Sequence, residues 1–71
     1  MRGNVCVEVP KEHFEELIDG NEFPQKVPTK WKLRVGEKIW WNCGAFSGIA
    51  RIISISTTNG DCTAQLVKIF E

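Results

Sequence analysis

The sequence predicts an α+β fold, in which a curled, mostly antiparallel sheet or partial β-barrel of about five strands carries one short helix after the first strand. Two patterns predict it. Apolar and polar residues alternate in several segments, as they do in half-buried strands, and one segment has the apolar spacing of a helix. Because 71 residues suffice for a single domain at most, residues 1–71 are expected to form one domain.

The first strand is expected over Asn4–Val9, where three valines alternate with other residues. A proline ends this strand, and a short helix is expected within Lys11–Asp19. Its Phe14, Leu17 and Ile18 stand at positions i, i+3 and i+4, which predicts that all three side chains are buried against the sheet. A glycine follows the helix, as is common at helix C-termini.

Two further strands are expected after a connection. Asn21–Thr29 contains two prolines and is predicted to be irregular. Lys30–Val35 alternates strictly and predicts a strand, and Lys38–Cys43 predicts another after the break at Gly36-Glu37.

The C-terminal part predicts the remaining strands. Gly44–Gly48 is expected to be a loop that presents Phe46 as a candidate exposed contact. Ile49–Thr57 is rich in β-branched residues, and Cys62–Phe70 is the last predicted strand. The Asn59-Gly60 pair between them favours a tight type I′ hairpin turn.

The stretch Lys30–Cys43 has the most distinctive composition, because it holds all three tryptophans and four of the nine basic residues. Strand parity places its apolar residues on one face: Trp31, Leu33 and Val35, then Ile39, Trp41 and Cys43. It places the cations and one tryptophan on the other: Lys30, Lys32 and Arg34, then Lys38, Trp40 and Asn42. The candidate contact residues for a nucleic acid or a partner are therefore Lys26, Lys30, Lys32, Arg34, Lys38, Trp40, Phe46 and Arg51.

Charge is balanced overall but divided along the chain. The net charge is zero, which predicts no strong bulk attraction to nucleic acids or membranes. Lys11–Glu22 carries one basic and five acidic residues, whereas Gln25–Lys38 carries five basic and one acidic. Either the two halves attract each other within the fold, or the basic half meets an anionic partner.

The three cysteines are odd in number and far apart, which predicts free thiols in a reduced, cytoplasmic protein. A zinc site from Cys6, Cys43, Cys62 and His13 would lack closely spaced ligand pairs, so no metal and no cofactor are expected. No apolar run approaches the roughly 20 residues of a membrane span, so no membrane partner is expected. The single histidine has no flanking catalytic signature, and we expect no enzyme activity.

Three short motifs resemble the small PUA-like domains, the ASCH group in particular: Leu17–Gly20, Leu33–Ile39 and Gly48–Ile52. This resemblance implies a barrel-like α+β module that binds RNA or modified nucleotides, and some ASCH proteins are hydrolases. Where that family often has Gly-x-Lys after the helix, this chain has Glu22, which argues against hydrolase activity. The SH3-like barrel is a rival resemblance, with Val35–Trp41 and Ala50–Ile55 as its first two strands.

The sequence therefore predicts a non-enzymatic binding module for RNA or another nucleic acid, which would bind through a basic–aromatic surface. The alternative is a small accessory or inhibitor protein that docks on another protein. A third interpretation is a solvated strand face opposite a tryptophan core, with no ligand.

Overall fold

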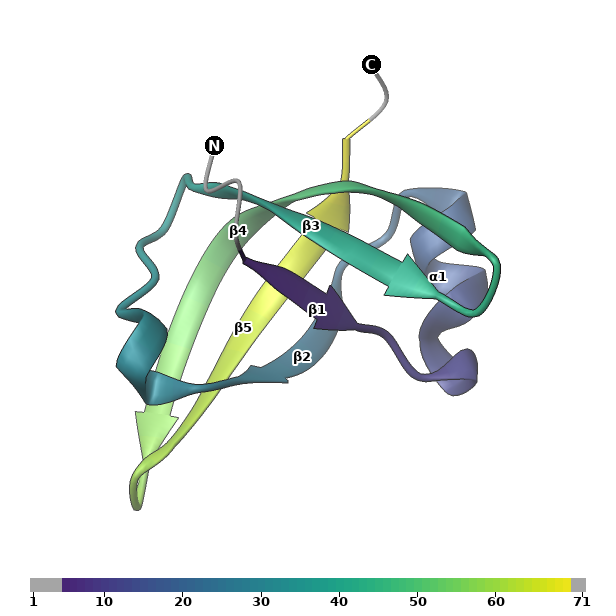
Figure 1. Ribbon diagram of the computed structural model, residues 1–71. Coiled ribbons are helices and arrows are strands. Elements are labelled where there is room, and N and C mark those ends of the chain that lie inside the picture. Colours follow the sequence, from purple (N-terminus) through teal and green to yellow (C-terminus); the bar gives the residue numbers. More distant parts are fainter. Residues whose placement is uncertain (1–4, 70–71) are drawn as a thin grey trace.

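The computed structural model describes residues 5–69, which form a five-stranded mixed sheet and one short helix (Figure 1). The strands lie in the order β1-β3-β4-β5-β2. In chain order the elements are β1 (Cys6–Glu8), the 3-10 helix η1 (Lys11–His13), α1 (Phe14–Asp19), β2 (Phe23–Val27), the 3-10 helix η2 (Thr29–Trp31), β3 (Lys38–Cys43), β4 (Phe46–Thr58) and β5 (Asp61–Lys68). The predicted fold class is confirmed.

The sheet curls into a half-barrel whose two edges are β1 and β2 (Figure 1). β1 pairs with β3 in parallel, and the other three pairings are antiparallel. The Gln25 side chain of β2 donates a hydrogen bond from Nε2 to the Glu8 carbonyl oxygen of β1, over 3.2 Å. A side chain thus links the two edge strands where no backbone ladder joins them.

Two tight turns connect the three longest strands. Asn59 and Gly60 have φ values of 52° and 83°, as the predicted type I′ turn between β4 and β5 requires. Gly44 has a φ of 63° and starts the two-residue turn between β3 and β4, the position where a type II′ turn favours glycine. The loop expected over Gly44–Gly48 is therefore shorter than predicted, because Phe46 already belongs to β4 and pairs with Cys43.

The core fills the concave face of the sheet and the space beneath the helix. It consists of Val5, Val7, Val9, Leu17, Phe23, Val27, Ile39, Trp41, Cys43, Ala50, Ile52, Ala64 and Leu66. Trp41 is the largest of these side chains, and its partner across the ladder is Gly48. A Cβ atom at Gly48 would stand 2.9 Å from the Trp41 ring, so the ring occupies the space that a side chain there would need.

The helix covers one end of the half-barrel, beside the turn between β3 and β4 (Figure 1). Leu17 is fully buried, as predicted. Phe14 packs against the core but is only half-buried, and Ile18 is 48% exposed, so the prediction that Ile18 is buried is wrong. Successive residues of an α-helix are about 100° apart around its axis, so Ile18 turns away when Leu17 faces the core. Gly20, at a φ of 78°, ends the helix, and the Asn21 N–H bonds back to the Glu16 carbonyl over 2.9 Å.

The strand predicted over Lys30–Val35 is absent. Thr29–Trp31 is a 3-10 turn, and an irregular segment with Lys32 at a φ of 50° follows. Both sides of β3 are already taken by β1 and β4, so this segment has no strand beside β3 to pair with.

The alternation of apolar and polar residues in Lys30–Val35 does not come from a strand. Trp31 and Leu33 pack against the core as expected, whereas Val35 is 62% exposed instead of facing the core. Val35 lies in a tight turn that the Glu37 N–H closes by bonding to the Arg34 carbonyl over 3.2 Å. Gly36 occupies the third position of this turn with a φ of 94°, which is the glycine position of a type II turn.

The connection predicted over Asn21–Thr29 instead contains β2, which pairs antiparallel with β5. Two prolines indicated irregular structure, but Pro24 lies on an edge strand, where a missing N–H does not break the sheet. Phe23 and Val27, at the two ends of β2, are buried in the core.

Candidate functional site

The convex outer face of the sheet carries the exposed tryptophan that strand parity predicted. Ile39, Trp41 and Cys43 face the core, while Lys38, Trp40 and Asn42 point the other way. Trp40 is 37% exposed and the adjacent Trp41 is 4% exposed. The two neighbouring indole rings therefore have separate roles, one on the surface and one in the core.

The strand register identifies the neighbours of Trp40 on this face. Across the sheet it pairs with Cys6 of β1 on one side and with Ile49 of β4 on the other. Two residues along each strand, Lys38 pairs with Arg51, and Arg51 in turn pairs with Val67 of β5. We call the side chains of Lys38, Trp40, Ile49, Arg51 and Val67 the outer-face patch.

Two cations stand directly opposite each other in this patch. Lys38 is half-buried and Arg51 is exposed. Like charges directly opposite each other on a sheet repel, so this pair makes the outer face locally cationic. The acidic residue on this face of β1, Glu8, lies on the far side of Trp40, opposite Asn42. The Trp40 ring thus separates a cationic side of the patch from a polar one.

The segment that connects η2 to β3 carries further basic residues and ends next to the outer-face patch. Lys30, Lys32 and Arg34 are all exposed, but they lie on η2 and the irregular segment after it and not on one face of a strand. The Gly36 N–H bonds to the Ile52 carbonyl over 2.8 Å, and the Ile52 N–H bonds to the Glu37 carbonyl over 2.9 Å. These two bonds hold the end of the connection against β4, one residue beyond Arg51.

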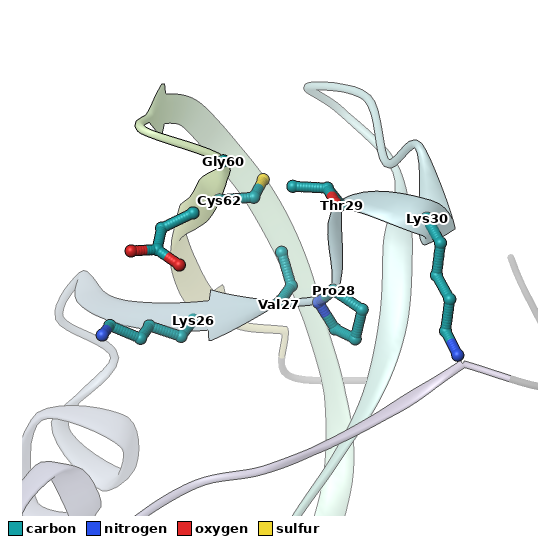
Figure 2. A pocket seen from close by; sticks show the side chains of 8 residues that line it. Lys26, Val27, Pro28, Thr29, Lys30, Gly60 and Cys62 are labelled. Carbon is teal, nitrogen blue, oxygen red and sulfur yellow. The ribbon is translucent and has the colours of Figure 1, made fainter.

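Lys26 and Lys30 lie elsewhere, at the rim of a pocket of about 300 Å³ between β2, η2 and the turn from β4 to β5 (Figure 2). Asp61 and Cys62 also line this pocket. Figure 2 shows the side chains of Lys26 and Lys30 extending away from one another. Because the two ammonium groups do not converge and a carboxylate is present, this pocket is a poor anion site.

Phe46 lies at the helix end of the molecule, apart from the predicted cations of the outer face. It is 59% exposed, and its ring centroid is 5.2 Å from that of Phe14. We call Phe14, Ile18 and Phe46 the helix–hairpin patch. The glycine-flanked position of Phe46 predicted an exposed contact, whereas helical spacing alone predicted that Ile18 is buried and gave no sign of its exposure.

The cysteines and the histidine of the described residues lie apart from one another on different elements. Cys6 is exposed on β1, Cys43 is buried on β3, and Cys62 is half-buried on β5, and all three are free thiols. Within residues 5–69, no group of three His, Cys, Asp or Glu side chains could hold a metal ion. The His13 ring stacks on Phe23, with centroids 6.0 Å apart. None of the helices in this range is long and apolar enough to cross a membrane.

The outer-face patch combines two kinds of group that bind nucleic acids. Lysine and arginine bind phosphate oxygens, and an accessible indole face stacks on an unpaired base. Ile49 and Val67 were not predicted as contact residues. Their strands are predicted from β-branched residues, but only the register places these two side chains beside Trp40 and Arg51. Comparisons with protein-family models, curated proteins and solved structures find no match to this chain.

Proposed function

We propose that this protein is a non-enzymatic binding module for RNA or another nucleic acid, and that the outer-face patch is its contact surface. The observation that carries the proposal is the position of Trp40, 37% exposed on an open sheet face beside the opposed Lys38 and Arg51. The motifs that resemble PUA-like domains support the same ligand class.

The patch suits unpaired nucleotides better than a regular duplex. Stacking on Trp40 requires a base whose face is free, which single strands, loops and bulges provide. The bases of a duplex are already stacked on one another. Within residues 5–69 the only α-helix has six residues, and its Leu17 side is packed in the core, so it is too short to present a reading surface in a major groove.

Binding through this patch should be weak and local. The zero net charge provides no long-range attraction, so the phosphate contacts come from the few cations beside the ring. Ile49 and Val67 extend the apolar surface around Trp40 and can contact a ribose or the edge of a base. Affinity should therefore depend on both the tryptophan and the two cations.

Fluorescence anisotropy with a labelled single-stranded RNA of about twelve nucleotides tests this proposal, at several salt concentrations between about 50 and 200 mM. If Lys38 and Arg51 each neutralise one phosphate, the slope of log affinity against log salt should be about −1.4. Arg51→Gln should weaken binding and reduce the magnitude of that slope by about 0.7. Trp40→Ala should cost about 1–3 kcal/mol of binding free energy.

Lys26→Gln is the matched control, because Lys26 is also an exposed cation on a strand but lines the pocket beside η2 and the turn between β4 and β5, and is not part of the outer-face patch. It should leave both affinity and salt slope close to those of the wild-type protein. Equal losses for Lys26→Gln and Arg51→Gln would mean that charge alone attracts RNA, without a defined surface. An affinity that does not change with salt would reject phosphate binding.

A further inference from the structure

We infer that the helix–hairpin patch is a docking site for a protein segment that combines a large apolar side chain with neighbouring Lys or Arg residues. This site lies at the helix end of the half-barrel, and its surface is distinct from the outer-face patch. It would give the module a protein partner in addition to a nucleic acid.

The apolar part of the site consists of side chains from two elements. Phe46 begins β4 and packs its ring on Phe14 of α1, at an interplanar angle of 41°. Ile18 is one helical turn beyond Phe14, on the same side of the helix, because residues four apart are neighbours on a helix surface. Phe46 and Ile18 are 59% and 48% exposed, so about half of each residue stays accessible to a partner.

A pocket beside these rings could hold the anchoring side chain of a partner. It has a volume of about 400 Å³ and is lined by Lys11, Phe14, Cys43, Gly44, Ala45 and Phe46. Most of these residues are apolar or small, and the lysine has a long aliphatic stem. Interface hot spots are typically large side chains buried in such pockets. The pocket is therefore suited to one aromatic or large aliphatic side chain.

The charges around the patch indicate the chemistry of the partner. Glu15 and Asp19 are exposed, and the helical spacing places them beyond Ile18 on the side away from Leu17. Glu12 and Glu22 flank the helix, whereas Lys11 is the one basic residue in Lys11–Glu22. An apolar surface beside this acidic face favours a partner that is apolar at its centre and basic around it.

The probe is a labelled synthetic peptide of about ten residues, with one tryptophan flanked by glycines and arginines. Two companion peptides replace the tryptophan by serine or the arginines by glutamates. Anisotropy should show that each companion binds at least about tenfold more weakly than the first. Phe46→Ser and Ile18→Ser in the protein should each weaken binding of the first peptide by a similar factor, with unchanged thermal unfolding of the Ile18→Ser variant.

Val35→Ser is the matched control, because Val35 is equally exposed, at 62%, but lies in the turn before β3. It should leave peptide affinity unchanged, and RNA affinity should survive Phe46→Ser, so this proposal and the nucleic-acid proposal can fail separately. Equal losses for Val35→Ser and Phe46→Ser would overturn the docking site. So would displacement of the peptide by RNA, or a dimer in sedimentation equilibrium that Phe46→Ser dissociates, since a second copy would then occupy the patch.

Discussion

Trp40 and Trp41 are adjacent in the chain but point to opposite faces of β3. The Trp41 ring packs in the core against Gly48, whereas Trp40 lies among Cys6, Ile49 and the two cations of the outer face. A chain this short buries only about 60% of the surface that it exposes when unfolded. Trp40, at 37% exposed, is therefore the one of the two tryptophans that can contact a ligand.

Alanine substitutions at these two positions should therefore have different effects. Trp41→Ala should lower the free energy of unfolding by about 3–5 kcal/mol, because it removes a buried ring and leaves a cavity. Trp40→Ala removes a ring that is 37% exposed, so it should cost less stability than Trp41→Ala and should act mainly on RNA affinity. Urea unfolding of both variants measures this. A larger loss of stability for Trp40→Ala would place that ring in the core and remove the basis for the outer-face site.

Gly48 has a steric role at the same place. Its alanine variant would bring a Cβ atom to within 2.9–3.0 Å of the Trp41 ring atoms, so the ring would have to move. Such overpacking should cost about 1–3 kcal/mol of stability. Ser47→Ala, on the neighbouring exposed residue, is the control and should be close to neutral. Equal unfolding midpoints for the two variants would contradict the close contact between Gly48 and Trp41.

At the scale of elements, the helix is attached to the sheet mainly by one side chain. An isolated helix of six residues is unstable in water, so α1 depends on packing to form. Leu17 is its only buried residue, whereas Ile18 beside it is 48% exposed. The two residues have nearly equal apolar size and thus report separately on packing and on surface exposure.

Leu17→Ala should cost about 2–5 kcal/mol, which is a large part of the stability of a small domain. Ile18→Ala should change the free energy of unfolding by less than about 1 kcal/mol. Far-UV circular dichroism during thermal unfolding compares the two variants. If Leu17→Ala melted like the wild-type protein, the packing of α1 on the sheet would be wrong.

The sequence correctly predicts an element where only one kind of structure produces the observed residue pattern. The alternation in Lys38–Cys43 and the Asn59-Gly60 pair predict β3 and a hairpin turn, and both are present. The alternation in Lys30–Val35 has a different cause, because Trp31 and Leu33 pack against the core from an irregular segment. Strand β2 was missed because proline is unfavourable only where its N–H would be needed, and an edge position cannot be known before the strand order is.

The candidate site shows the same limits. Parity within one strand was sufficient to place Trp40 and Lys38 outward. Arg51 joins them through the register of β3 with β4, which a single sequence does not specify. Phe46 and Lys26 were grouped with these residues by composition, but they lie at other places on the molecule. Which residues share a surface becomes clear only from the strand order and register of the whole sheet.

At the scale of the whole molecule, the opposite charges of the two chain segments lie on different surfaces. The acidic segment forms η1 and α1 at one end of the half-barrel, whereas η2 with Lys30 lies at the opposite end, beside the turn between β4 and β5 (Figure 1). A net charge of zero thus combines an acidic end with a basic end and a cationic outer face. This arrangement allows one small domain to contact an anion and a basic partner at separate places.

The central claim is that the outer-face patch binds unpaired nucleotides, and amide chemical-shift mapping tests it most directly. The ¹⁵N-labelled protein would be titrated with a short single-stranded RNA at low salt. We predict that the largest shifts fall on 38–42 of β3, 47–51 of β4 and the part of β5 around Val67, together with the Trp40 indole N–H signal. Shifts confined to α1 and the turn before Phe46, or no shifts at all, would contradict the claim.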